Sequence, residues 1–412
     1  MRPHLSSQIE FSQIIIDMET SAERLNQTRP QFFAGLNEKI NALRASGHDI
    51  IRLDIGSPDL PPAAHIIDAL ARSAARSDSH GYQAHTATPA LRQAWAEMYR
   101  RLYGVKLNPD QEVVPLLGSK EGIFNLMQAL VNPGDVVLIP DPGYLTYTQG
   151  ALLSGGEPYA LPLLPENRFL PDLERVPLGV VRRAKILWLN FPNNPTAAIA
   201  PLSFFESAVE FGRRNDLLVC HDAAYSQVTF DGYAAPSILQ VPGAKEVAIE
   251  FNTLSKSHNM AGWRVGTAVG QAEAIRALFT FKTHADSGHF LPILEAATAA
   301  MNGDQSWLGE RNEIYRERRD LALHYLNQMG LQAEIPRASL YIWLQVPPGW
   351  SSRDFATALL ESAHVSLTPG QVFGQHGEGY LRLSLTAPED RIASGLQRIA
   401  ESGLANPKKI SL

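Results

Sequence analysis

The amino-acid sequence predicts an α/β protein in which a large domain, with a mostly parallel sheet between helices, is joined to a smaller α+β domain. Three observations lead to this prediction. The chain has 412 residues, enough for two or three domains. Between residues 60 and 295, short apolar runs alternate with helical stretches, as in doubly wound sheets. After one long charged stretch, Trp307–Met329, the pattern changes to a different mixture of strands and helices.

The composition is that of an ordinary globular protein. Apolar residues make up 45% of the chain and charged residues 19%, which excludes wholesale disorder and fibrous architectures. A net charge of −6 argues against a nucleic-acid partner. Apolar runs such as Val136–Ile139 are too short to span a membrane. A single cysteine, Cys220, excludes an intrachain disulfide, and the N-terminal residues lack a leader pattern, so we expect a cytoplasmic protein.

The first elements are expected to belong to the smaller domain. Residues 1–28 read as an N-terminal arm, and residues 29–59 as the N-terminal part of the small domain. A helix is predicted over Phe33–Ser46, because an apolar periodicity ends there at Gly47. A short strand over Ile50–Ile55 and a turn at residues 56–59 follow.

Residues 60–295 are predicted to form the large domain. Helices such as Glu121–Val131 and Leu202–Arg214 lie between its strands, and Pro115 weakens the first strand prediction. The predicted strands are Glu112–Leu117, Val136–Ile139, Lys185–Leu189, Leu217–His221, Val247–Phe251 and Val265–Val269. Residues 296–412 then complete the small domain. Its predicted elements are the helix Trp307–Met329, the strand Leu340–Val346, the helix Ser352–Ser362, the strand Tyr380–Leu385 and the helix Asp390–Ser402.

Ligands of parallel α/β sheets bind at the carboxyl ends of the strands, so residues that follow strands are candidates for a site. Ser119 and Lys120 follow the first strand, where free N–H groups at a helix start, a hydroxyl and an ammonium would bind an anion. The alternative is that Ser119 is only a helix N-cap. The segment lacks the Walker spacing, and no G-x-G-x-x-G follows a strand, which disfavours a nicotinamide dinucleotide.

Two further strand ends carry groups that suit a planar ligand. Tyr144 ends a stiff Pro-Asp-Pro-Gly turn and would stack on a ring, unless it is an ordinary core tyrosine. The segment 190–196 holds three asparagines and two prolines, which either present fixed amides to a ligand or simply make a turn.

The last two strand ends carry an acid and a base. Asp222 follows an apolar strand, and a carboxylate at that depth needs a positive partner such as a protonated ring nitrogen, unless it caps a helix. Lys256 follows the next strand and is a plausible Schiff-base nucleophile, while Arg264 could fork onto a phosphate. An anion loop, a stacking ring, an amide loop, a buried acid, a lysine and an arginine are together what pyridoxal phosphate requires.

The chain resembles the class I and II aminotransferases, which are fold type I pyridoxal-phosphate enzymes, from about Pro30 to Ala400. The resemblance rests on the motifs N-N-P-T (193–196), D-A-A-Y (222–225), S-K-S-H-N-M-A-G-W-R (255–264) and L-R-L-S-L (381–385). It implies that Lys256 holds pyridoxal 5′-phosphate covalently and moves the substrate proton, while Asp222 keeps the pyridine nitrogen protonated. It also implies that Asn194 and Tyr225 contact the phenolate oxygen and that Tyr144 stacks on the ring.

The resemblance also assigns the residues around the phosphate and the substrate. It implies that Arg382 binds the substrate α-carboxylate with help from Gly56 and Asn194. The alternative for Arg382 is a cross-strand ion pair. Tyr82 matches a tyrosine that reaches the phosphate of the partner subunit, which implies a homodimer with shared sites. The residues implied for the phosphate are Ser119, Lys120, Thr253 and Arg264.

Within the family, the segments 118–123, 131–144 and 221–245 look like those of LL-diaminopimelate aminotransferases. The substrates implied are small amino and keto acids, namely LL-diaminopimelate and 2-oxoglutarate in lysine biosynthesis. Two alanines, Ala87 and Ala197, and one leucine, Leu145, stand where the family has other residues. Gln31 stands where the family has a tyrosine. Gln31 and the 80–88 loop lie near the expected substrate entrance, so they bear on the choice of substrate.

Several other functions remain open at this stage. The nearest is an aminotransferase with another donor, such as alanine, an aromatic amino acid or methionine. A pyridoxal-phosphate lyase that acts at Cβ or Cγ would need the same cofactor residues. A DNA-binding regulator is disfavoured because residues 1–28 are too short for a helix-turn-helix domain. A catalytically inactive binding protein is disfavoured because every cofactor position is filled. His80 and His85 lack further ligands at metal-binding spacing, so no metal is expected.

Overall fold

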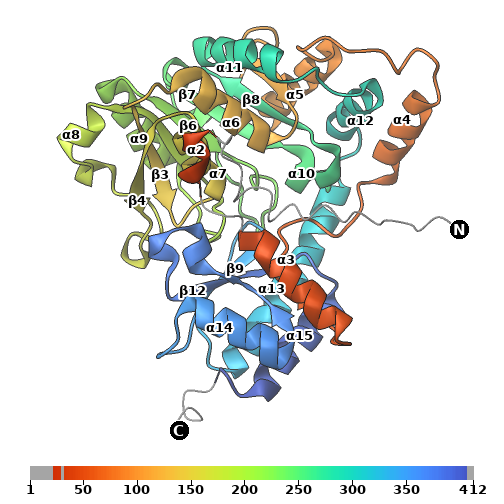
Figure 1. The fold of residues 1–412 in the computed structure, drawn as a ribbon. Helices are drawn as coiled ribbons and strands as arrows, with labels where there is room; N and C mark the ends of the chain where they lie inside the picture. The colour runs from red at the N-terminus through yellow and green to blue at the C-terminus, as the bar shows by residue number, and fades with distance from the viewer. Residues whose placement is uncertain (1–21, 29–31, 406–412) are drawn as a thin grey trace, which may run out of the picture.

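The computed structural model describes residues 22–28 and 32–405 (Figure 1). Most of the predicted arm, residues 1–28, and the substitution Gln31 therefore lie outside the described residues. Glu23–Asn26 forms one helical turn, α2. No helix in the described part of the chain is long and apolar enough to cross a membrane.

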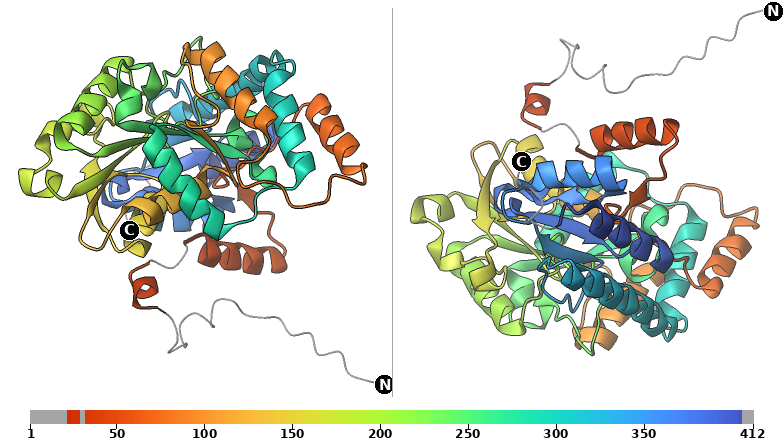
Figure 2. Two further views of the ribbon diagram at one scale, coloured as in Figure 1. Left: turned by 90° about the horizontal axis from the view of Figure 1, so that it is seen from above. Right: turned by 90° about the horizontal axis from the view of Figure 1, so that it is seen from below.

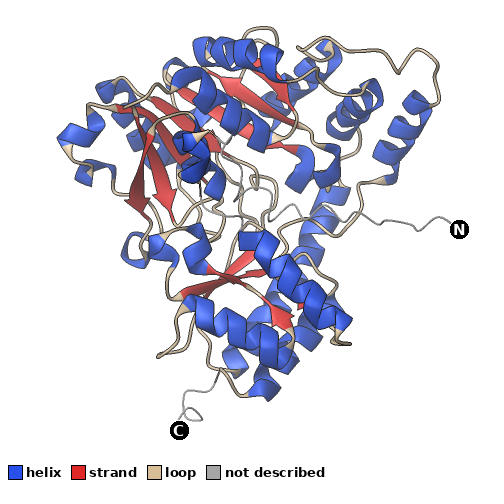
Figure 3. Cartoon of the chain, viewed as in Figure 1, coloured by secondary structure: helices blue, strands red, loops and turns tan. Residues whose placement is uncertain are grey.

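A seven-stranded sheet forms the centre of the larger lobe (Figure 3). Its strand order is β2-β8-β7-β6-β5-β3-β4, and only β8 runs antiparallel to its neighbours β2 and β7. The strands are β2 (Val113–Leu116), β3 (Val136–Asp141), β4 (Glu157–Pro162), β5 (Ala184–Asn190), β6 (Leu218–Asp222), β7 (Ala248–Thr253) and β8 (Gly266–Gly270). This is the predicted α/β architecture with a mostly parallel sheet.

Helices cover both faces of this sheet (Figure 2). Ile186 and Trp188 of β5 join one apolar cluster, and Leu187 and Leu189 join the other, because successive side chains of a strand point to opposite faces. The helices are α4 (Ala64–Ala74), α5 (Pro89–Tyr103), α6 (Ser119–Leu130), α7 (Leu145–Leu153), α8 (Leu178–Val181), α9 (Leu202–Asn215), α10 (Leu254–Ser257), α11 (Ala272–Ala285) and α12 (Leu291–Asn302).

The smaller lobe has a core of its own, around an antiparallel sheet of order β11-β12-β9. Residues from both ends of the chain build it, since β1 pairs with β10 in parallel. Its elements are α3 (Phe32–Ala45), β1 (Ile51–Arg52), α13 (Trp307–Gln328), β9 (Tyr341–Gln345), α14 (Ser352–Ala358), a π-helical turn (Leu359–Ala363), β10 (Val365–Ser366), β11 (Thr368–Pro369), β12 (Tyr380–Ser384) and α15 (Glu389–Ser402).

The predicted domain boundary between residues 295 and 296 falls inside α12. That helix packs against α4 and α5, and its residues Leu294 and Ala297 belong to the same apolar cluster as the large sheet. Because a helix that is buried in one core moves with that core, we propose that the large domain extends to Asn302.

Four strands differ from the sequence-based predictions. The strand predicted over Ile50–Ile55 is only Ile51–Arg52, and β4 and the two-residue strands β10 and β11 were not predicted at all. β4 is the edge strand, with Pro158 and Pro162 in it and most of its residues partly or fully exposed, so it lacks the apolar run that marks the inner strands. Pro115 is tolerated within β2 because β2 is the opposite edge of the same sheet.

Candidate active site

A cavity of about 420 Å³ opens between the two cores, at the carboxyl ends of β3, β5, β6 and β7. All but one of the site residues predicted from the sequence line it. They are Gly56, Ser119, Lys120, Tyr144, Asn194, Asp222, Tyr225, Thr253, Lys256, Arg264 and Arg382. The exception is Tyr82, which lies outside the cavity on the loop before α5 and is 93% exposed.

Lys256 lies on α10, directly after β7, so the sheet delivers its side chain to the cavity. Its Nζ donates a hydrogen bond to the carbonyl of Gly56 at 2.5 Å and makes no ion pair with any described residue. Burial, together with the nearby cations Arg382 and Arg264, lowers the pKa of Lys256 from 10.5 to about 8. A larger share of this amine is therefore unprotonated and nucleophilic at neutral pH than for an exposed lysine.

Asp222 is the last residue of β6 and is 5% exposed. Its carboxylate accepts hydrogen bonds from the Tyr147 hydroxyl at 2.8 Å and the Ala224 N–H at 3.2 Å. Burial raises the pKa of Asp222, and no described cationic side chain bonds to it. The helix N-cap alternative is wrong, because a turn rather than a helix follows β6. A cationic ring nitrogen in the cavity would supply the missing charge.

Tyr147 was missed by the sequence analysis. It lies on α7, one helical turn after Tyr144, and its ring stacks on Trp188 with centroids 5.2 Å apart. The hydroxyl then meets a carboxylate 75 residues away in the sequence. The only local signal was its spacing of three residues from Tyr144 in a helix, which brings both side chains to one face.

Arg382 lies on β12 and is 4% exposed. Its guanidinium donates to the Asn194 Oδ1 at 2.9 Å and to the Asp54 carbonyl at 2.8 Å. It also lies 4.3 Å from the Tyr341 ring centroid. No described carboxylate pairs with it, so the cross-strand ion-pair alternative is wrong. A buried guanidinium that faces neutral acceptors suits an incoming carboxylate.

An anion cradle is present at the start of α6. Gly118 is the residue before this helix and has φ +82°, and a Cβ at this position would overlap the guanidinium of Arg264. Ser119 is the first helical residue and makes no side-chain cap, so the N-cap alternative for Ser119 is wrong. The unpaired N–H groups of the first turn, with Lys120 and Arg264 beside them, favour a doubly charged anion.

Thr253 and Ser255 also line the cavity, near Arg264. The Thr253 hydroxyl donates to the carbonyl of Val265 at 2.9 Å, and the Arg264 Nη1 lies 3.5 Å from the Ser255 Oγ. Tyr225 forms a 2.9 Å hydrogen bond with the hydroxyl of Tyr341, and burial raises the pKa of Tyr225 well above its usual value. The Tyr225 hydroxyl, which lines the cavity, is therefore neutral.

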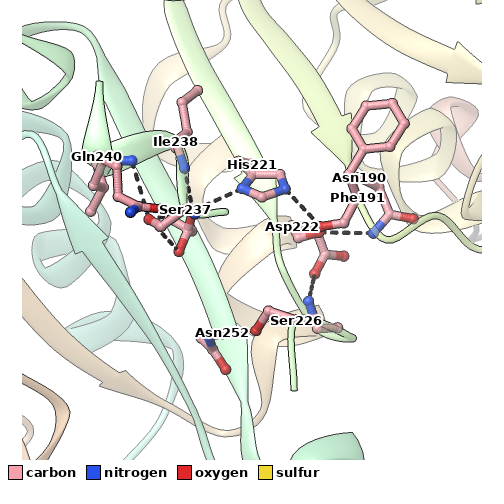
Figure 4. Close-up of polar contacts among 12 residues, drawn as sticks. Asn190, Phe191, His221, Asp222, Ser226, Ser237, Ile238, Gln240 and Asn252 are labelled. Carbon is pink, nitrogen blue, oxygen red and sulfur yellow. Dashed lines mark hydrogen bonds and ion pairs between the residues drawn. The ribbon is translucent and has the colours of Figure 1, made fainter. Parts of the chain in front are cut away.

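A buried polar network includes His221, the residue before Asp222 (Figure 4). His221, next to Asp222, lies 2.8 Å from the Glu250 carboxylate through Nδ1 and 2.9 Å from the Phe191 carbonyl through Nε2. Glu250 also accepts from the Tyr99 hydroxyl at 2.8 Å and from the Ile238 N–H at 3.0 Å. The network joins β6 to β7 and to the residue after β5, next to Asp222. The sequence analysis did not identify it.

Metal binding has no support in the described part of the chain. No group of three or more His, Cys, Asp or Glu side chains there is arranged to hold a metal ion. Cys220 is fully buried in β6, and burial raises the pKa of its thiol.

Comparisons with known proteins agree with this geometry. The family model described as aminotransferase class I and II matches residues 48–399. A relative named LL-diaminopimelate aminotransferase, from Moorella thermoacetica, is 49% identical over 378 residues, which cover 92% of this chain and 97% of the relative. A relative named LL-diaminopimelate aminotransferase 2, from Trichormus variabilis, is 46% identical over 93% of this chain and 98% of its own length.

Solved structures are similar over the same range. Substrate-bound BacF from Bacillus subtilis superposes with a TM-score of 0.90 at 36% identity and covers 93% of this chain and 98% of that one. An aspartate aminotransferase variant from Thermus thermophilus gives a TM-score of 0.87 at 30% identity, over 93% of this chain and 100% of that one. The match to the family model and these similarities show that the chain belongs to the class I and II aminotransferases.

Proposed function

We propose that the protein transfers the amino group of LL-diaminopimelate to 2-oxoglutarate, with pyridoxal 5′-phosphate as its bound cofactor. The observation that carries this proposal is the similarity to several relatives named LL-diaminopimelate aminotransferase, at 45–49% identity over at least 92% of this chain. The geometry of the cavity supports the reaction type, and the relatives support the choice of donor.

The residues of the cavity fit pyridoxal phosphate. The Gly118 cradle with Arg264 suits its phosphate, and the unpaired carboxylate of Asp222 suits its pyridinium nitrogen. Lys256, with its pKa lowered to about 8, suits a covalent bond to its aldehyde carbon. When bound, the cofactor would supply an electron sink for the negative charge that develops at the substrate Cα.

The remaining roles are those that the resemblance to the family implies for side chains that line the cavity. We propose that Tyr144 stacks on the ring and that Tyr225 and Asn194 donate to the phenolate oxygen. The cofactor phosphate would be held by Ser119, Lys120, Thr253 and Arg264. The resemblance assigns Tyr82 to the same phosphate in a second subunit, and its side chain, which is 93% exposed and lies outside the cavity of its own chain, is accessible for that contact.

The substrate is positioned by groups on the small-domain side. Arg382 would fork onto the α-carboxylate, with the Gly56 backbone and Asn194 beside it. Lys256, whose pKa is lowered to about 8, would be the base that takes the Cα proton of the substrate. Asp222, whose oxygens accept from Tyr147 and the Ala224 N–H, would supply the negative charge opposite a ring nitrogen.

Two alternatives remain testable. A different amino donor would change the groups at the cavity mouth and leave the cofactor residues unaffected. A Cβ or Cγ lyase would release ammonia and a keto acid from one substrate, without an amino acceptor. We also propose a homodimer, and a cytoplasmic location stays a prediction from the sequence.

Product analysis tests the proposal. Purified protein would be incubated with pyridoxal phosphate, 2-oxoglutarate and one amino acid at a time, and glutamate, ammonia and keto acids would be quantified. We expect glutamate to form in proportion to LL-diaminopimelate consumed, with little from alanine, methionine or phenylalanine. Release of ammonia without glutamate would contradict an aminotransferase. Equal glutamate from another donor, with none from LL-diaminopimelate, would contradict the proposed substrate.

A further inference from the structure

The cavity that contains Arg382 is also lined by residues of α3 and β1. Phe33 and Asn37, one turn apart on α3, line it together with Arg52 of β1. Ile55, which is 41% exposed, lines it as well. None of these residues has a part in the cofactor chemistry proposed above.

Arg52 is held in one orientation by its neighbours. Its Nε and Nη2 donate to the two carboxylate oxygens of Asp54, both at 2.6 Å, and its Nη1 donates to the Asn37 Oδ1 at 3.0 Å. A guanidinium has five N–H groups, so three are engaged with described residues and one remains on each terminal nitrogen. The Arg52 side chain is 18% exposed, whereas Asp54 is 1% exposed and acts as a brace.

Among the cations of the cavity, Arg52 is the one to which no cofactor or substrate anion has been assigned. In the proposed function, Lys120 and Arg264 would hold the phosphate, Lys256 would hold the cofactor, and Arg382 would take the α-carboxylate. Of the described cationic side chains that line the cavity, Arg52 has only the protein carboxylate of Asp54 as its partner. Its hydrogen bonds to Asp54 offset the charge but leave the two outer N–H groups free to bind a carboxylate.

Arg52 also lies at a suitable distance from Arg382. Both guanidinium groups bind the same residue, because Arg382 contacts the Asp54 carbonyl at 2.8 Å and Arg52 contacts the Asp54 side chain at 2.6 Å. Bond lengths within Asp54 then limit the separation of the two nearest nitrogens to roughly 10 Å. A short chain with a carboxylate at each end can span that distance.

We propose that Arg52, braced by Asp54 and Asn37, binds the distal carboxylate of the substrates and so selects dicarboxylic amino and keto acids. This inference rests on the proposed function, because LL-diaminopimelate and 2-oxoglutarate share a carboxylate at the end away from the reacting carbon. Alanine and pyruvate lack that group. Arg52 would therefore act in both half-reactions, although the two substrates differ in length.

The test compares substrates that do and do not carry the distal carboxylate. Half-reactions of the loaded protein would be followed by absorbance for LL-diaminopimelate against alanine, and for 2-oxoglutarate against pyruvate. We expect Arg52→Gln to lower kcat/KM tenfold to a hundredfold for the dicarboxylic substrates, the range of a lost charge-assisted hydrogen bond. The values for alanine and pyruvate should stay within about twofold. Arg52→Lys should restore part of the loss, because it keeps the charge without the fork.

A matched control and a binding measurement separate recognition from folding. Arg391→Gln removes an arginine that pairs with Asp49 at 2.8 Å, outside the cavity, and should change none of these values. Binding of heptanedioate and hexanoate, two unreactive acids, would be measured by calorimetry on the holoprotein. Arg52→Gln should weaken heptanedioate at least tenfold and leave hexanoate unchanged.

The possible failures are distinguishable. An equal loss for all four substrates would overturn the inference, since Arg52 would then act by positioning Asp54 and Arg382. Unchanged selectivity in both Arg52 variants would overturn it as well. If the wild-type protein ignores LL-diaminopimelate, the proposed function fails. The role of Arg52 is then decided by comparing kcat/KM for 2-oxoglutarate and pyruvate, and by the binding of the two unreactive acids.

Discussion

At the scale of single residues, the environment of Lys256 determines the pH at which the protein can take up the proposed cofactor. A pKa of about 8 leaves roughly a tenth of this amine unprotonated at pH 7, against less than a thousandth for an ordinary lysine. Because only the free amine attacks an aldehyde, the rate of cofactor uptake by the apoprotein should rise with pH and level off above about 8. Stopped-flow absorbance measures this rate.

The control for that experiment is an isolated amine with an ordinary pKa. N-acetyl-lysine should show no plateau until well above pH 9, since nothing lowers its pKa. A plateau for the protein at the same high pH as the control would contradict the environment described here for Lys256. Lys256→Ala should abolish the covalent uptake altogether.

Tyr147 offers a second test at this scale. Its hydroxyl donates to Asp222 at 2.8 Å, and this hydrogen bond lowers the pKa of a carboxyl that burial otherwise raises. Tyr147→Phe removes the donor, so Asp222 should hold its charge less firmly, and the half-reaction with the amino donor should slow about tenfold. Tyr159→Phe on the edge strand β4 is the control and should leave the rate unchanged. An unchanged rate in Tyr147→Phe would show that Asp222 needs no such support.

The residues that the sequence could identify share one property. Asp222, Lys256 and Asn194 each lie within four residues of the carboxyl end of an apolar strand, so a rule about strand ends finds them. Tyr147 and His221 act through partners that only the fold brings near, such as Glu250 on the neighbouring strand. Arg52 precedes the cavity residue Gly56 by four positions, and nothing in its local sequence shows that Asn37 of a separate helix orients it.

At the scale of elements, two loops contain alanines where the family has glycines. Ala197 has φ +59° and Ala87 has φ +56°, a left-handed conformation that disfavours any residue with a Cβ by about 1 kcal/mol. Ala197→Gly relieves this strain but makes the unfolded chain more flexible and removes a buried methyl group. The two effects nearly cancel, so we expect the free energy of unfolding to change by less than about 0.5 kcal/mol.

The same alanine-to-glycine substitution within a helix should change the free energy of unfolding by more. Ala71 is an exposed interior residue of α4, where Ala71→Gly should lower the free energy of unfolding by about 1 kcal/mol. Denaturant titration of both variants with bound cofactor measures the difference. If Ala197→Gly destabilises the protein as much as Ala71→Gly does, the left-handed conformation carries no strain.

The elements themselves were predictable where they are buried. Inner strands such as β5 and β6 have apolar side chains on both faces, which gives continuous apolar runs in the sequence. β4 at the sheet edge has no such run, and β1 is shortened to two residues because its pairing with β10, from the other end of the chain, is that short. The local sequence pattern therefore does not predict edge strands or strands that pair with distant parts of the chain.

At the scale of the whole molecule, the exposed Tyr82 supports the proposed dimer. A tyrosine side chain that is 93% exposed is hardly stabilised by contacts within its own chain, whereas its hydroxyl would contact the phosphate bound in a second subunit. Tyr82→Phe should weaken cofactor retention several-fold without a change in sedimentation coefficient. Mixed dimers of Tyr82→Phe and Lys256→Ala chains test the sharing of sites.

The mixed dimers have a clear expected behaviour. In them, the one site that keeps Lys256 receives an intact Tyr82 from the other chain, so this site should retain the cofactor as tightly as a wild-type site. A mixed dimer that loses cofactor as readily as the Tyr82→Phe homodimer would contradict a contribution across the subunits. A monomer that retains cofactor with wild-type affinity would do the same.

The assignment of Lys256 and of the proposed reaction is tested most directly by an absorption spectrum of the purified protein with pyridoxal phosphate, before and after each amino acid. We expect a band from the cofactor bound to Lys256, its conversion by LL-diaminopimelate and by glutamate, and its return with 2-oxoglutarate. Failure of the band to form in wild-type protein would contradict the assignment of Lys256 and of the cofactor. A band that responds to glutamate but not to LL-diaminopimelate would preserve the aminotransferase and contradict its proposed substrate.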